Sequence, residues 1–174
     1  MTRVAVNVLR AFNIDIFKLS NSKHDYQFEI DKSFFEEFEN SPIKVGNANV
    51  HVELDKSATL MEVTIEVKGK VVLTCDRSLE EFDEEIDISN KMIFKYGDQW
   101  EELSDEIVVI PRDEQRLNVA HYIFEFVILS LPIKKIHPNY RDEEFDGVYY
   151  ASDNDKNKSE ANDPRWNKLK DLLK

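Results

Sequence analysis

Residues 61–96 read MEVTIEVKGKVVLTCDRSLEEFDEEIDISNKMIFKY, and this stretch decides the fold. Between residues 61 and 75 apolar side chains occupy the odd positions, and Glu, Thr or Lys mostly stands between them, which is the period of a strand buried on one face. Between residues 82 and 96 the apolar side chains occupy mainly even positions, and the odd positions from 81 to 87 are acidic. The short polar segment 75–80 separates the two patterns. We therefore predict two long antiparallel strands joined at a tight tip.

Gly69 interrupts the apolar series of the first strand. A glycine at an inward position of a strand predicts a bulge or a sharp bend, because it has no side chain to pack. We therefore expect the first strand to curl across the core.

Shorter patterns surround this hairpin. Alternation of apolar and polar residues predicts strands at 10–18, 26–30, 47–54 and 107–110, and the first two are expected to pair as a hairpin across residues 20–25. Residues 31–42 change to helical spacing, with Asp31 or Ser33 as the N-cap and Pro42 as the stop, which predicts a helix of about two turns. The acidic residues 98–106 are predicted to form a loop.

A longer helix is predicted after this loop, with Asp113 as its N-cap and Pro132 as its end. Its apolar positions repeat at helical spacing, so one face is expected to lie on the concave side of the sheet. The sequence therefore predicts an α+β fold, a strongly twisted antiparallel sheet of about 5–7 strands, with a half-barrel as an alternative, closed by one long amphipathic helix, and with short helices near the start and at the C-terminus. The apolar face of the long helix consists of Leu117, Ala120, Phe124, Val127, Ile128 and Leu131.

Composition changes after the long helix and divides the chain into three parts. Residues 1–136 are predicted to form a single α+β domain. Residues 137–162 are polar and acidic, which predicts a flexible linker. Residues 163–174 return to helical spacing, with Asp163 as the N-cap and Pro164 at the first helical position, so a basic amphipathic C-terminal helix is expected.

The chain of 174 residues carries a net charge of −12 at pH 7, and 41% of its residues are hydrophobic. It has no apolar run near the roughly 20 residues of a membrane helix and no signal-peptide pattern, so a cytoplasmic protein without membrane contact is expected. One cysteine excludes an intramolecular disulfide and a thiolate zinc cage built by this chain alone, so neither a metal site nor a cofactor is predicted. Cys75 is read as a small buried residue, with a reactive thiol as the alternative.

The sequence offers no established catalytic pattern. Its four glycines are isolated and form no phosphate-binding loop, and its histidines do not fall at a metalloprotease spacing. The paired carboxylates of residues 80–87 alternate as the solvent-facing side of a strand does. We therefore predict a protein that is not an enzyme and has no small-molecule substrate, with a Cys75–His nucleophile pair as the catalytic alternative.

The candidate contact residues are few and basic, because the largely acidic stretch 76–106 would repel a phosphate backbone. Arg77 at the tip is the first candidate, with a local salt bridge as the alternative. A cluster after the long helix is the second, with lysines solvated at a helix end as the alternative. The predicted RNA- or partner-binding residues are Arg77, Lys134, Lys135, His137, Arg141, Arg165 and Lys168, and the predicted apolar docking residues are Trp166 and Leu169.

The order of these motifs resembles that of the YceD family, the large ribosomal RNA subunit accumulation proteins. The resemblance rests on the strand, Gly69, strand and tip Cys-x-Arg-x-Leu-Glu, on VAHYIFEFVILSLP at residues 119–132, and on DPR at residues 163–165. Ser78 stands where the family has its second tip cysteine, and residues 137–162 lack the further cysteines of many members. The zinc site that those cysteines suggest is therefore not expected in this chain.

The resemblance implies a non-enzymatic factor in ribosome biogenesis. Such a factor would support accumulation of large-subunit ribosomal RNA by binding that RNA, a ribosomal protein, or both. The alternative is an acidic interaction adaptor or chaperone whose negative charge shields a basic ribosomal protein. Association with large-subunit particles would favour the first interpretation, whereas a soluble complex with one basic protein would favour the second.

Overall fold

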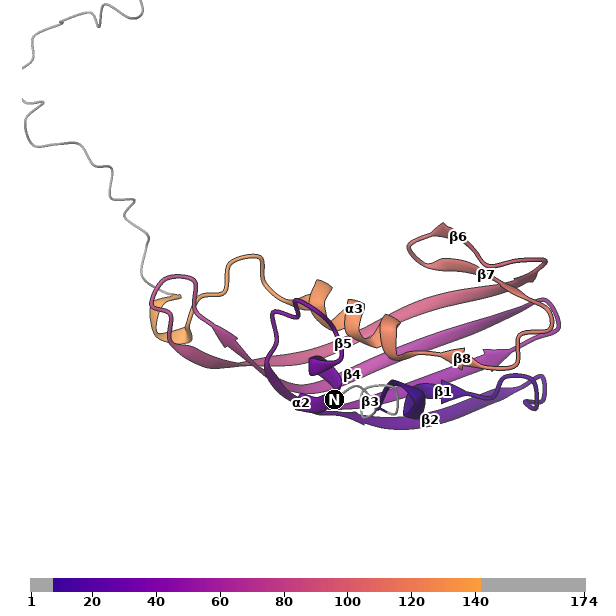
Figure 1. Ribbon diagram of the computed structural model, residues 1–174, viewed down its shortest axis with the longest axis horizontal. Coiled ribbons are helices and arrows are strands. Elements are labelled where there is room, and N and C mark those ends of the chain that lie inside the picture. Colours follow the sequence, from indigo (N-terminus) through magenta and orange to yellow (C-terminus); the bar gives the residue numbers. More distant parts are fainter. Residues whose placement is uncertain (1–7, 142–174) are drawn as a thin grey trace, which may run out of the picture. The chain divides into compact units, whose positions relative to one another are not determined.

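The structure, a computed structural model, describes residues 8–141. In this part of the chain a six-stranded sheet has the order β2-β3-β4-β5-β7-β6, and β1 and β8 form a separate two-stranded ladder. Figure 1 shows the long strands running side by side, with α3 across one face. The strands of the larger sheet are β2 (Lys23–Ile30), β3 (Val45–Lys56), β4 (Leu60–Thr74), β5 (Glu81–Gly97), β6 (Glu101–Ser104) and β7 (Ile107–Pro111). The remaining elements are two 3-10 helices, η1 (Leu9–Phe12) and η2 (Pro138–Tyr140), the helices α2 (Lys32–Glu36) and α3 (Ala120–Ser130), and the short strands β1 (Asn13–Ile14) and β8 (Leu117–Asn118).

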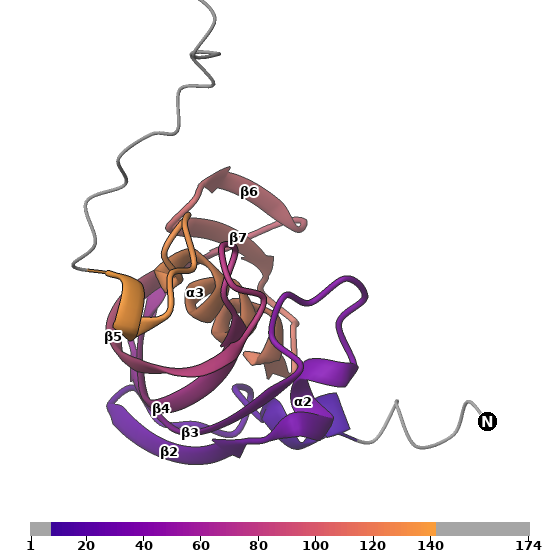
Figure 2. The ribbon, with the colours of Figure 1, turned by 90° about the vertical axis from the view of Figure 1, so that its left-hand side faces the viewer.

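The fold of the described residues is α+β, as predicted, and its sheet is twisted and open, not closed into a barrel. Figure 2 shows the sheet curled around α3. The expectation of a wholly antiparallel sheet is wrong, because β7 runs parallel to β5 and places Val108 beside Phe94. The chain leaves β5, forms β6 at the edge of the sheet, and returns as β7 between the two. Residues 101–104 were predicted to lie in a loop, but they form β6, which has no buried residue and therefore no alternation to detect.

The predicted central hairpin is confirmed. β4 and β5 pair in an unbroken antiparallel register, from Leu60 opposite Lys95 to Thr74 opposite Glu81. The apolar side of both strands faces the core, against which α3 packs. The buried residues of the hairpin are Met61, Val63, Ile65, Val67, Val71, Leu73, Phe82, Ile86, Met92 and Phe94.

Gly69 does not form the predicted bulge. It lies opposite Ala48 of β3 and opposite Ile86 of β5 within continuous ladders. A Cβ atom at position 69 would lie 2.4 Å from the Cβ of Ala48 and 2.3 Å from the carbonyl oxygen of Asn47. The glycine is therefore explained by the close approach of β3 and β4, which leaves no room for a side chain.

The first predicted strand, residues 10–18, is also corrected. Leu9–Phe12 form η1, and only Asn13 and Ile14 form a strand, which pairs with β8 and not with β2. The alternation that suggested a longer strand is real, since Phe12, Ile14 and Ile16 are all buried, but it reflects an irregular segment packed on the core. β2 pairs instead with β3.

The long helix begins later than predicted. Asp113 is not its N-cap, Leu117 belongs to β8, and α3 starts at Ala120. The Asn118 side chain explains the difference, because its amide nitrogen donates to the Leu9 carbonyl at 2.8 Å and to the Asn13 side-chain oxygen at 2.7 Å. These contacts hold residues 117–118 against β1. The buried residues of α3 are Ala120, Ile123 and Val127.

The short helix α2 and its predicted cap Asp31 are confirmed, but the helix ends at Glu36, well before the predicted stop at Pro42. The Asp31 carboxylate accepts hydrogen bonds from the backbone nitrogens of Ser33 at 2.9 Å and Phe34 at 3.3 Å. The predicted C-terminal helix, residues 163–174, lies outside the described residues, as do residues 142–162 of the predicted linker. Among residues 8–141 no helix has the length and apolar character needed to cross a membrane.

Candidate binding surface at the hairpin tip

The tip loop, residues 75–80, closes the hairpin between β4 and β5. The Cys75 backbone nitrogen donates to the Glu80 carbonyl at 2.8 Å, and the Leu79 nitrogen donates to the Cys75 carbonyl at 3.0 Å. Leu79 adopts a φ of 62°, a left-handed conformation that costs an L-residue about 1–2 kcal/mol. Its side chain is nevertheless 76% exposed. The loop therefore presents an apolar side chain to solvent from a strained backbone position.

The segment after α3 holds this loop in place. We call residues 135–141 the latch segment. The Asp76 nitrogen donates to the Lys135 carbonyl at 2.7 Å, and the Lys135 nitrogen donates to the Asp76 carboxylate at 2.8 Å. The His137 nitrogen donates to the sulfur of Cys75 at 3.3 Å. One backbone–backbone hydrogen bond and two hydrogen bonds from backbone nitrogens to the side chains of Asp76 and Cys75 therefore join the tip loop to the latch segment.

Side chains of the latch segment extend the contact onto β5. The Arg141 guanidinium pairs with the Glu84 carboxylate, and its central carbon lies 5.9 Å from the centre of the Phe82 ring. The His137 ring packs edge-on against the same phenyl ring at 5.6 Å. Figure 1 shows the turn of the latch segment against the end of the β4–β5 hairpin. His137–Arg141, the first residues of the predicted linker, are thus part of the folded unit.

The tyrosine of the latch segment contacts the loop itself. The Tyr140 hydroxyl donates to the Glu80 carboxylate at 3.4 Å. The guanidinium carbon of Arg77 lies 5.6 Å from the centre of the Tyr140 ring, which is a cation–π distance. Tyr140 was not among the predicted site residues, although the His-Pro-Asn-Tyr sequence is the kind of segment that starts a short helical turn.

Cys75 is buried, as its reading as a small core residue predicts, but its sulfur is also a hydrogen-bond acceptor. It accepts from the backbone nitrogens of Arg77 and Ser78, each at 3.4 Å, and of His137 at 3.3 Å. Burial raises the pKa of the Cys75 thiol, but the hydrogen bonds from the Ser78 side chain and from these backbone groups together lower the pKa to about 7. Ser78 therefore stabilises the thiolate from the position where the resemblance places a second cysteine.

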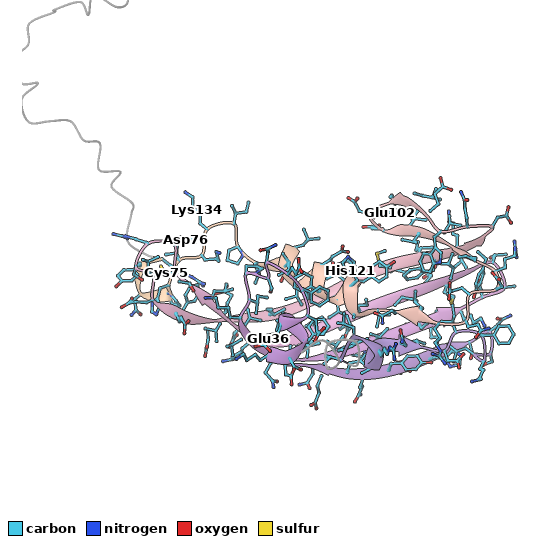
Figure 3. The ribbon with its side chains drawn as sticks, in the orientation of Figure 1. Glu36, Cys75, Asp76, Glu102, His121 and Lys134 are labelled. Carbon is cyan, nitrogen blue, oxygen red and sulfur yellow. The ribbon has the colours of Figure 1, made fainter. Side chains whose placement is uncertain are left out.

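Five predicted contact residues come together at the tip. Arg77 lies on the loop, Lys134 directly precedes the latch segment, and the other three lie within that segment. Figure 3 places Lys134 at the same end of the folded unit as Cys75 and Asp76. Lys135 Nζ is 3.9 Å from Asp76, whereas Lys134 is exposed and forms no ion pair within residues 8–141. The positions that the structure does not describe are Arg165, Trp166, Lys168 and Leu169.

A hollow of about 720 Å³ borders η1, β2 and β3, away from the tip. Several polar groups in its wall, including Asp31 and His51, have partners within the described residues. Asp31 caps α2, and the hydrogen bond from the Ser33 hydroxyl lowers the pKa of that carboxyl. The His51 ring lies 3.0 Å from the carboxylate of Asp25. Nowhere between residues 8 and 141 do three or more His, Cys, Asp or Glu side chains form a group that could hold a metal ion.

Residues 8–141 thus define an α+β protein whose candidate binding surface is a hairpin tip held by the latch segment. The family model described as "Large ribosomal RNA subunit accumulation protein YceD" matches residues 63–173, which contain the central hairpin, α3 and the latch segment. The chain belongs to this family. Comparison with curated proteins and with solved structures gave no match. The family is named for the accumulation of a ribosomal RNA and not for an enzymatic activity.

Proposed function

We propose that this protein is a non-catalytic factor of large ribosomal subunit biogenesis, and that it supports accumulation of large-subunit ribosomal RNA by contacting that RNA at the hairpin tip. The observation that carries the proposal is the family match over residues 63–173. The action is expected in the cytoplasm, where ribosomal subunits are assembled in cells without a nucleus.

The geometry of the tip supports an RNA contact. Lys134 is exposed and has no carboxylate partner among the described residues. Arg77 is held over the Tyr140 ring, and Lys135 is joined to the loop through its backbone. Cations in fixed positions bind phosphate oxygens with less loss of side-chain entropy than cations on mobile loops. The tip therefore offers one cation held in place, Arg77, and one exposed cation without a carboxylate partner among the described residues, Lys134.

The remaining predicted contacts are in the C-terminal segment, at Arg165 and Lys168. Together with the tip they allow about three to six phosphate contacts. Each contact makes the fall of log affinity with log salt concentration steeper by somewhat under one unit. The salt dependence should therefore be shallower than that of a strongly basic RNA-binding domain. Carboxylates on the β5 surface would oppose binding, so Glu81→Gln with Glu85→Gln should strengthen it, if it has any effect.

Binding of large-subunit ribosomal RNA transcripts at several salt concentrations tests the proposal. Replacing Lys134 and Lys135 by Ala should make the slope shallower by about two. The matched control is Lys68→Ala with Lys70→Ala, which removes the same charge from β4, where both lysines pair with β5 carboxylates. The control should leave the slope unchanged. A salt-insensitive complex, or equal effects of the two double variants, would reject an RNA contact at the tip.

An acidic adaptor or chaperone for a basic ribosomal protein is the second candidate function. The net charge of −12 favours it, because a negative surface attracts a lysine-rich partner. Size fractionation of cell extracts distinguishes the two. The factor should migrate with large-subunit particles, whereas the adaptor should migrate with one basic protein and no particle.

A further inference from the structure

A groove lies between β6 and α3, near the end of β5 that is remote from the tip. β7 pairs only with Ile93–Gly97 of β5, so roughly 40 Å of strand separates this region from Glu81 beside the tip loop. The hollow has a volume of about 310 Å³. Figure 3 shows Glu102 on β6 and His121 on α3, which line it from two sides. We call it the acidic groove, and its walls include Trp100, Glu101, Glu102, His121, Tyr122 and Glu125.

The charge of the groove is negative and largely uncompensated. Glu101 and Glu102 are exposed, and neither forms an ion pair with another residue of the described range 8–141. Glu125 has one partner, the His121 ring at 3.1 Å. Burial, and then the charges of Glu125 and Glu102, raise the pKa of the Tyr122 hydroxyl. The tyrosine therefore lies in the field of two carboxylates.

Aromatic and apolar side chains stand beside these carboxylates. Trp100, in the wall of the groove, is 50% exposed, and Leu103 on β6 is 53% exposed. The Trp100 indole nitrogen donates to the Glu114 carboxylate at 3.2 Å, which fixes the ring. Trp100 also lines a second hollow of about 650 Å³, whose walls include Asp113, Glu114 and the basic Arg116. On the side of the acidic groove, where the lining has no lysine or arginine, an indole beside carboxylates suits the ammonium or guanidinium group of a lysine or arginine.

The strand that carries the groove is an edge strand, but its shape disfavours pairing with another strand. Its register shifts between Glu102 and Ser104, opposite β7. A bulge and outward charges interrupt an edge and prevent regular strand addition. Recognition at this edge therefore depends on side chains and not on backbone hydrogen bonds.

We propose that the acidic groove binds a lysine- or arginine-rich segment of a partner polypeptide, with one cationic side chain held between Glu102 and Glu125 and its aliphatic stem against Trp100. Charge complementarity selects this occupant, because the same carboxylates repel a nucleic-acid backbone. The proposal gives the basic partner of the second candidate function a defined surface. It does not depend on the RNA contact at the tip, since the two surfaces share no residue. The protein would then join an RNA at one end of its sheet to a basic polypeptide at the other.

The test uses the full chain with Trp166→Phe, which leaves Trp100 as the single tryptophan. Its fluorescence is followed while a synthetic lysine-rich peptide is added, and a glutamate-rich peptide of equal length serves as the comparison. The lysine-rich peptide should change the Trp100 signal in a saturable way, and the glutamate-rich peptide should not. Glu102→Gln with Glu125→Gln should raise the Kd at least about fivefold, as expected for the loss of the two partly exposed charge pairs to the bound cation.

A matched control separates the groove from net charge. Glu81→Gln with Asp83→Asn removes the same charge from the exposed side of β5 near the tip, and it should change the Kd less than about twofold. Trp100→Ala, followed with a labelled peptide, should weaken binding at least about fivefold. Equal effects of the two charge variants, or no effect of Trp100→Ala, would overturn the proposal.

Two other occupants give distinct results. If a single-stranded RNA oligonucleotide displaces the lysine-rich peptide and changes the Trp100 signal, the groove is not selective for cations and the proposal fails. If the Trp100 signal already changes with salt before any peptide is added, the chain's own basic residues 163–174 occupy the groove, and the proposal of an external partner fails as well.

Discussion

The sulfur of Cys75 shows how a single residue joins two distant segments. Backbone nitrogens of the tip loop and of the latch segment both donate to it, and the pKa of the thiol falls to about 7. The thiolate is a stronger hydrogen-bond acceptor than the thiol. We therefore expect the contacts at the tip to depend on the protonation of this sulfur near neutral pH.

This equilibrium predicts a dependence of stability on pH. The pKa of Cys75 is lower in the folded chain, about 7, than its ordinary value of 9.0, so the unfolded chain holds the proton more tightly between these values. The contribution of Cys75 to the free energy of unfolding should be fully present above about pH 9 and lost as the pH falls through about 7. Denaturant unfolding of the wild type and of Cys75→Ala, compared across this range, measures it.

Ser78→Ala provides the control for that experiment. It removes the side-chain donor to the sulfur, so it should raise the pKa of Cys75, which can be followed by the ultraviolet absorbance of the thiolate. The pH range over which Cys75 changes the free energy of unfolding should then become narrower, because its folded pKa moves toward its unfolded pKa. If the difference in unfolding free energy between the wild type and Cys75→Ala stays constant with pH, the predicted role of the thiolate is wrong.

At the scale of elements, the close contact of β3 and β4 determines what position 69 tolerates. Gly69→Ala would bring a Cβ within 2.4 Å of Ala48 Cα, a backbone atom that cannot move away alone. We expect the variant to lose about 2–3 kcal/mol of unfolding free energy, as in other overpacked positions. Lys68→Ala, on the exposed side of the same strand, should change stability by less than about 0.5 kcal/mol. If Gly69→Ala and the wild type unfold at similar urea concentrations, β3 and β4 can move apart to accept the side chain, and the prediction is wrong.

The latch segment is the second element with a testable role. Arg141→Ala removes the ion pair to Glu84, and Tyr140→Phe removes the hydrogen bond to Glu80. The double variant should speed amide exchange at Asp76 and His137 about fivefold while global stability changes little, because both contacts are partly exposed. Lys134→Ala is the control and should leave exchange unaltered. Unchanged exchange in the double variant would mean that the backbone contacts alone hold the tip.

The sequence was sufficient to predict the elements that have one buried side. β3, β4 and β5 alternate because one face of each packs on the core, and Asp31 is a cap that can be recognised locally. The start of α3 could not be predicted, because the Asn118 side chain binds Leu9 and Asn13 far away in the chain. Gly69 was misread for a similar reason, since its close neighbour is in another strand.

The candidate site was predicted in part. The basic residues at the tip could be named from their charge. The latch segment could not, because its hydrogen bonds join Lys135 to Asp76, 59 residues apart in the chain, and no local pattern indicates them. The exposure of Leu79 and Trp100 was not predicted either, since each is a single apolar residue within a polar segment. It follows only from the folded geometry.

At the scale of the whole molecule, the family match and the tip geometry lead to one central claim, that the chain supports accumulation of large-subunit ribosomal RNA. Because the net charge is −12, we expect any RNA contact to be confined to few positions, and we propose that these lie at the tip. The remote acidic groove would add a contact to a basic polypeptide without interfering at the tip.

The most direct test is the ratio of large-subunit to small-subunit ribosomal RNA in cells depleted of this protein. The ratio should fall on depletion, free small subunits should accumulate, and wild-type protein should restore the ratio more fully than the Lys134→Ala, Lys135→Ala variant. A ratio that stays unchanged on depletion would contradict the claim.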